Sequence, residues 1–141
     1  MIIFLPNETV FTSNGEKVLQ PLEVIEKRNN SEWFLECEFL VDDKDWVQQD
    51  YIAVVETKEK GKQPFRFRNI ESGITIRCEA WHIGFDTQNY GVELATVVNG
   101  NCQAALNALK ADSTPVLPFT LTSSISTLRS FSVENMSLYE G

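Results

Sequence analysis

Apolar and polar residues alternate most clearly between Trp33 and Val41. One face of this segment carries Trp33, Leu35, Cys37, Phe39 and Val41. The opposite face carries Glu36 and Glu38, with Phe34 and Leu40 as apolar exceptions at its ends. Because side chains alternate with period two along a strand, the pattern predicts a half-buried β-strand over these residues.

Shorter apolar or alternating runs, bounded by turn residues, predict further strands along the first two thirds of the chain. Gly, Asn and Pro favour turns, and they lie at Pro6-Asn7, Ser13–Gly15, Asn29–Ser31, Gly61 and Glu71–Gly73. The expected strands are Ile2–Leu5, Thr9–Thr12, Leu22–Lys27, Tyr51–Val55, Phe65–Asn69 and Ile74–Trp81. The last of these places on one face Ile74, Ile76, Cys78, Ala80 and His82.

The pattern changes to helical spacing after about Asn99. Asn101 is placed to cap a helix, whose apolar positions are Cys102, Ala105, Leu106 and Leu109. Pro115 and Pro118 prevent its continuation, and strands are expected again over Leu117–Leu121 and Leu128–Val133. Asn135 is a candidate cap for a final helix through Met136, Leu138 and Tyr139. Asp42 is a candidate cap for a short helix that has Asp43 and Asp45 in its first turn.

The expected architecture is therefore mainly β (α+β), with one or two helices in the C-terminal third. Two regions are predicted: residues 1–98, made of strands, and residues 99–141, a helix-strand-helix segment. Because the last expected helix runs to Gly141, we expect the natural protein to continue into a following domain.

Composition narrows the function classes. Hydrophobic residues make up 43% and charged residues 23% of the 141 residues, which is typical of a folded domain. The net charge is −8, from 12 bases and 20 acids, and this argues against nucleic-acid binding by phosphate neutralisation. The acids are concentrated in Glu32–Asp50, which we interpret as a solvated face or as a surface that repels polyanions or meets a basic partner.

The cysteines and the apolar runs do not indicate a metal knuckle, a disulfide scaffold or a membrane anchor. Cys37, Cys78 and Cys102 are widely spaced and form no CxxC pair, so they are expected to be free thiols, buried rather than reactive. The opening residues, MIIFLPNE, lack the basic region of a signal peptide. No apolar stretch approaches 18 residues, so no membrane insertion is expected.

No catalytic, cofactor-binding or metal-binding residues are predicted. His82 is the only histidine, and its position on an apolar strand face favours packing over catalysis. Glu36 and Glu38 lie on the outward face of a strand, where a solvated role is expected, and Asp42, Asp43 and Asp45 are the other clustered carboxylates. Asp43-Lys44-Asp45 begins like a calcium loop, but Gln48 stands where that loop requires glycine. Phosphate-binding glycine motifs are also absent from the sequence.

Several segments, taken in order, resemble one family. These are SNGEKVLQPLEVIEKRNNSEWFLECEF, then GKQPFRFRNIE with Gln63, Pro64, Phe65 and Arg66, then CEAWHIGFD with Ala80, His82, Ile83 and Asp86. AALNALKADSTPVLPFTLTSSI and SVENMSLYEG follow. Together they resemble the N-terminal region of phage and prophage tail proteins called tail endopeptidases or phage minor structural proteins, which are similar to baseplate hubs.

The resemblance implies a tail-tube-like β-barrel in residues 1–98, which would belong to a trimeric hub that continues the tail tube. It implies self-association in the full-length protein, contacts with distal tail and tail-tube proteins, and a location in the virion tail after assembly in the bacterial host cytoplasm. Family cell-wall cleavage belongs to C-terminal domains, so an enzyme is not expected here. The acidic segment Glu32–Asp50 would suit a wall that repels DNA.

Two other functions are consistent with the residues. A small barrel or sandwich could bind carbohydrate through an aromatic platform, formed by Trp33, Trp46, Trp81, Phe34, Phe65 and Phe67. A hydrolase would instead use the acidic cluster, through Glu36 or Asp43.

Overall fold

A computed structural model describes residues 1–115 and 117–137, which divide into two compact units, Met1–Ile83 and Gly84–Gly141. Strands take up 49% of the chain and helical residues 15%, so the predicted mainly-β class is confirmed. The division falls before the strand Gly91–Gly100, whereas the sequence placed the change at residues 98 and 99. The reason is that the strand Gly91–Gly100 forms backbone hydrogen bonds with the later strands Arg129–Ser137 and Ser113–Thr114, so it belongs with the helix that follows it.

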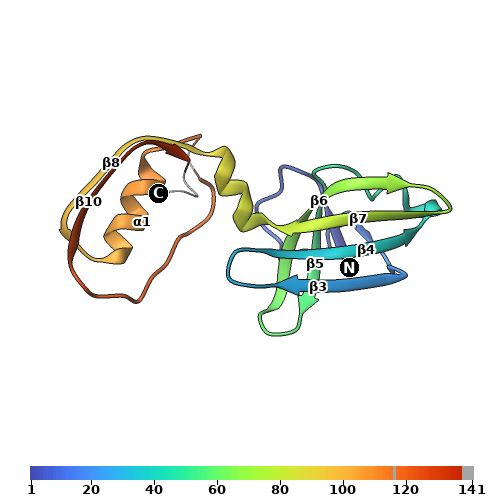
Figure 1. Ribbon diagram of the computed structural model, residues 1–141. Coiled ribbons are helices and arrows are strands. Elements are labelled where there is room, and N and C mark those ends of the chain that lie inside the picture. Colours follow the sequence, from blue (N-terminus) through green and yellow to red (C-terminus); the bar gives the residue numbers. More distant parts are fainter. Residues whose placement is uncertain (116, 138–141) are drawn as a thin grey trace. The chain divides into compact units, whose positions relative to one another are not determined.

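The first unit is built on one antiparallel sheet of seven strands, in the order β2-β1-β5-β6-β7-β4-β3 (Figure 1). Their bounds are β1 Ile2–Phe4, β2 Lys17–Val18, β3 Glu23–Arg28, β4 Trp33–Leu40, β5 Ile52–Thr57, β6 Gly61–Ser72 and β7 Thr75–His82. The expected strands are thus present except Thr9–Thr12, which takes no regular structure.

The alternation along β4 determines which face of the sheet is buried. Leu35, Cys37 and Phe39 lie opposite Ala80, Cys78 and Ile76 of β7, and all six are buried. Phe65 and Phe67 of β6 join them. Burying apolar area at about 25 cal/mol per Å² is the main stabilising contribution to such a core.

The sheet is not closed into a barrel, in contrast to the expected barrel. Within the part of the chain that the structure describes, β3 pairs only with β4 and β2 only with β1, so both strands are edges. β2 is only two residues long. β3 is connected to the hairpin between β5 and β6 by side chains and not by a backbone ladder. Closure of a barrel requires hydrogen bonds between the first and last strands, and these two strands do not make them.

In its described residues, the second unit has a three-stranded sheet and one α-helix. β8 (Gly91–Gly100) lies between β10 (Arg129–Ser137) and β9 (Ser113–Thr114). The helix α1 (Cys102–Ala111) packs on this sheet (Figure 1), and its Leu109 is buried with Val92, Ala95 and Leu117. The predicted cap is confirmed, because the Asn101 side chain accepts a hydrogen bond of 2.9 Å from the Ala104 backbone N–H.

Three local predictions are wrong. Leu117–Leu121 is not a strand in its described residues, and Asn135 and Met136 lie in β10 rather than in a helix. Pairing with β8 and packing of Phe131 and Val133 on the second core stabilise the extended form. Leu138 and Tyr139 lie outside the described residues.

Near Asp42 there is only the 3₁₀ turn η1 (Val41–Asp43), preceded by Leu40 without a side-chain cap.

Candidate functional site

The edge strand β3 presents both a row of backbone groups and a cluster of side chains. Asn29 directly follows β3 and Glu32 directly precedes β4, and Asn29 N–H donates to the Glu32 carbonyl at 2.9 Å, so these two residues form a hydrogen-bonded pair. Backbone N–H and C=O groups point to alternate sides along a strand. Every second residue therefore bonds to β4, so Lys27 and Ile25 also direct their N–H and C=O groups to β4. Val24, Glu26 and Arg28 therefore direct their N–H and C=O groups away from the sheet.

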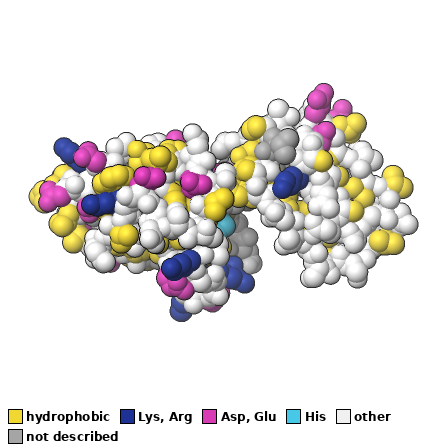
Figure 2. All heavy atoms as spheres, turned by 180° about the vertical axis from the view of Figure 1, so that it is seen from behind, with side chains coloured by type: hydrophobic (Ala, Val, Ile, Leu, Met, Phe, Trp, Pro, Cys, Tyr) yellow, Lys and Arg dark blue, Asp and Glu magenta, His cyan; other side chains and the backbone are white. Residues whose placement is uncertain are grey.

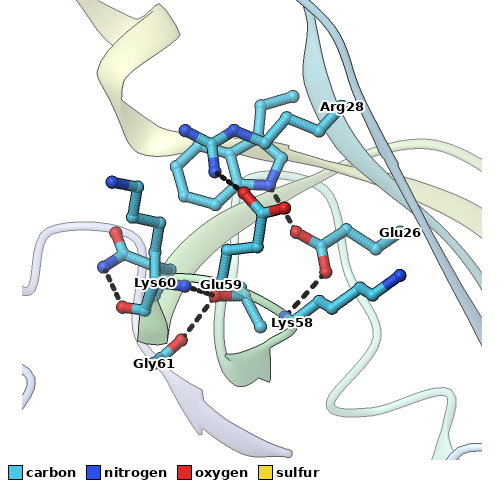
Figure 3. A network of polar contacts seen from close by, with 9 residues as sticks. Glu26, Arg28, Lys58, Glu59, Lys60 and Gly61 are labelled. Atoms are coloured by element: carbon cyan, nitrogen blue, oxygen red, sulfur yellow. Dashed lines mark hydrogen bonds and ion pairs between the residues drawn. The ribbon is translucent and has the colours of Figure 1, made fainter.

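The hairpin between β5 and β6 reaches this edge through polar side chains (Figure 3). The Glu26 carboxylate accepts the Lys58 backbone N–H at 3.0 Å, and Arg28 forms an ion pair of 3.6 Å with Glu59. The hairpin itself is held by the Thr57 hydroxyl, which donates to the Gly61 carbonyl at 2.7 Å. Side chains thus bridge two segments that are not neighbours in the sheet.

An aromatic stack lies beside this bridge, on the core face of the sheet. The Arg28 guanidinium lies 4.2 Å from the Trp33 ring centroid, and the His82 ring is parallel to Trp33 at 4.4 Å. Trp33 Nε1–H donates to Glu26 at 2.9 Å, and His82 Nε2 lies 2.9 Å from Gln63 Oε1. Phe65 meets Trp33 edge-on at 5.6 Å.

These contacts support the predicted packing role of His82. The ring of His82 is stacked on Trp33, and the Gln63 side-chain amide oxygen is a hydrogen-bonding neighbour of Nε2. That the chain is not an enzyme stays a prediction.

The predicted carboxylates lie on the opposite face of the sheet, as expected from the period of two. Glu36 pairs with Lys27 at 2.7 Å, and Glu38 accepts the Thr75 hydroxyl at 2.7 Å. Glu79, the register partner of Glu36, accepts Nδ2–H of Asn69 at 2.8 Å, and all three glutamates line a shallow depression of about 430 Å³. Each carboxylate therefore already has a positively charged or hydrogen-bonding partner, which favours a surface role over general acid catalysis.

The Asp42, Asp43 and Asp45 carboxylates surround the turn η1. The Asp43 carbonyl accepts the backbone N–H groups of Trp46 and Val47, so the segment is a closed turn. Within residues 1–115 and 117–137, no group of three His, Cys, Asp or Glu residues is arranged to hold a metal ion. Over the same residues, no helix is both long and apolar enough to cross a membrane.

The three cysteines are free thiols, as predicted. Cys37 and Cys78 are buried and lie opposite each other on β4 and β7, while Cys102 in α1 is only partly buried. A hydrogen bond with Cys78, together with burial, raises the pKa of the Cys37 thiol well above its usual value. A thiol that stays protonated is a poor nucleophile, so Cys37 is expected to be unreactive. Both thiols are buried in the core of the first unit.

The six aromatic residues considered for carbohydrate binding do not form one platform. Phe65 and Phe67 are fully buried, and Trp33 and Trp46 pack against the same core. Phe34 and Trp81 stack on each other at 4.7 Å on the opposite face. A sugar platform needs coplanar, exposed rings, and this set is divided between two sides of the sheet.

Two segments that carried the family resemblance meet in space. Phe65 of β6 is the register partner of His82 of β7, and Gln63 contacts the same imidazole. Arg66 donates to the backbone carbonyls of Pro6 and Asp50 at 2.9 and 2.7 Å. These residues hold the sheet together, so the motif positions are explained by packing.

Sequence reasoning missed Glu26, Arg28 and Lys58. Val24, Glu26 and Arg28 stand at every second position of β3, so they share one face of that strand. This period of two was the only feature of the sequence that could have placed Glu26 and Arg28 on the core face. Lys58 is brought to them by sheet curvature, for which the sequence carries no signal.

Comparisons of the chain with protein families, with curated proteins and with solved structures find no match.

Proposed function

We propose that this chain is a structural assembly domain of a phage or prophage tail, part of a hub ring that continues the tail tube. The observation that carries the proposal is the open edge β3 of a curved seven-stranded sheet. Edge backbone groups are ready to pair with another chain, and joining edges of successive copies would close a ring. The order of family-like segments along the chain supports the same reading.

The charge distribution is consistent with a tube. The sheet face opposite the core carries Glu36, Glu38 and Glu79 among its side chains. We propose that this face lines the channel of the ring, where negative charge prevents DNA from adhering. The partners would be further copies of this chain, forming a trimer in the full-length protein, together with distal tail and tail-tube proteins.

Light scattering after gel filtration, over a wide range of protein concentration, tests the proposal. We expect assembly beyond the monomer that is lost in Val24→Pro, because proline removes an N–H directed away from β4 and leaves the ladder with β4 intact. Ile25→Lys should act similarly, since a lysine on an edge strand opposes pairing.

The matched control is Val98→Lys, which adds the same charge to an exposed position of β8 in the second unit. Circular dichroism establishes that each variant is folded. Assembly that survives both β3 substitutions, or a wild-type chain that stays monomeric at every concentration, would contradict the proposed ring.

A further inference from the structure

An apolar patch lies where β4 ends and β7 begins, beside the residue that precedes β3. Leu40 is the register partner of Thr75, the last pair between these strands, so Val41 and Ile74 lie one residue beyond it. Leu22 joins them, because its N–H donates to the Glu38 carbonyl at 2.8 Å. We define these four residues, Leu22, Leu40, Val41 and Ile74, as the strand-end patch.

All four side chains of the strand-end patch are exposed. Ile74 is 96% exposed, and the other three are between 43% and 53% exposed. The sequence pattern placed Ile74 on the buried face of a strand, but it lies in the turn before β7. Single exposed apolar residues are ordinary, whereas four of them at the ends of neighbouring strands are a candidate interaction surface.

The charged residues next to the patch in the sequence are mainly acidic. On the face of the first unit that Figure 2 shows, hydrophobic, acidic and basic side chains are interspersed. Glu23 follows Leu22 in the sequence, and Asp42 and Asp43 follow Val41. Glu71 lies three residues before Ile74. Arg77 and Lys44 are the cations closest to them in sequence. An apolar centre with a charged rim is the usual anatomy of a protein interface.

This charge distribution limits the occupant. Two copies docked face to face through the patch would bring their carboxylates together, and like charges placed opposite each other are strongly unfavourable. Nucleic acid and anionic lipid are repelled for the same reason. A protein segment that alternates basic and apolar side chains complements both the centre and the rim.

We propose that the strand-end patch docks a basic, apolar segment of a different protein. The outward backbone groups of the β3 edge belong to Val24, Glu26 and Arg28, and none of these residues is part of the strand-end patch. The inference does not depend on ring formation, and a monomeric chain would dock the same segment.

Fluorescence anisotropy with a labelled peptide of alternating lysine and isoleucine or valine tests the docking. We expect saturable binding by the full chain that weakens as salt is added, because rim charges are screened. Ile74→Ser should weaken binding roughly tenfold by removing apolar contact without changing charge. Asp42→Asn combined with Asp43→Asn should weaken it by about threefold at low salt.

Val98→Ser is the matched control, because it removes an exposed β-branched residue from the second unit, and it should bind like the wild type. A peptide with glutamate in place of lysine should not bind. The proposal is overturned if the lysine peptide fails to bind, if Ile74→Ser binds as well as wild type, or if the glutamate peptide binds equally. Sedimentation showing a dimer that Ile74→Ser dissolves would also overturn it, in favour of a second copy.

Discussion

At the scale of single residues, burial and pairing separate the three cysteines into two kinds. Cys37 and Cys78 are register partners in the core of the first unit, whereas Cys102 lies in the first turn of α1 and is partly buried. The contact with Cys78 and burial raise the pKa of Cys37, so its reactive thiolate is scarce at neutral and mildly alkaline pH.

We therefore expect iodoacetamide at pH 8 to modify Cys102 first in the folded chain, with Cys37 and Cys78 protected. Peptide mass spectrometry over time measures the three rates separately. In concentrated guanidinium chloride all three should react at comparable rates, which serves as the control. Native modification of Cys37 as fast as that of Cys102 would contradict the buried thiol pair.

At the scale of elements, α1 shows how one polar side chain defines a helix start. The first N–H groups of a helix have no partner within it, and the Asn101 side chain accepts one of them from Ala104. Leu109 on the opposite end of the helix is buried in the second core. The cap and the buried face together explain why residues 102–111 are helical.

Asn101→Ala should reduce the free energy of unfolding by about 1 kcal/mol, because the Ala104 N–H loses its acceptor. Thermal unfolding followed by circular dichroism measures the change. Asn107→Ala is the matched control: Asn107 is exposed within the same helix and accepts a hydrogen bond from Gln103 at 2.9 Å. Its replacement should be close to neutral, since alanine has the higher helix propensity. An equal loss in both variants would exclude a specific capping effect.

At the scale of the whole molecule, each unit has its own hydrophobic core. Among residues 1–115 and 117–137, the buried residues of the first core lie between Ile3 and Ala80 and those of the second between Val92 and Leu117, with partly buried neighbours of the second core from Tyr90 to Val133. A compact unit with a core of its own can in principle fold alone.

We accordingly expect a fragment of residues 1–83 to fold by itself. Urea unfolding should be cooperative, and its NMR amide spectrum should overlay that of the full chain for the strands of the sheet. The matched variant Phe39→Ala, which removes a fully buried ring, should lower its stability by about 3 to 5 kcal/mol. A fragment without dispersed amide signals would show that the first core needs the second unit.

Much of the candidate site could be anticipated, but its connections could not. The alternation along β4 correctly placed Glu36 and Glu38 opposite the core, and the alternation along β7 placed His82 on the packed face. The partners of these residues come from strands that are distant in sequence: Gln63 for His82, and Thr75 for Glu38. Spacing carries no information about which strands become neighbours, so these contacts were not predictable.

The sequence by itself determined the mainly-β class, most strand positions, the start of α1 and the free state of the thiols. These follow from local periodicity, turn residues and capping, which act over a few residues. Only the tertiary structure decided the order of strands, the open edges, the bridge from Glu26 to the β5–β6 hairpin and the exposure of Ile74. The strand order, the open edges and the bridge depend on which segments, distant in sequence, the sheet brings together. The exposure of Ile74 depends on where the strand begins, because Ile74 lies just before β7.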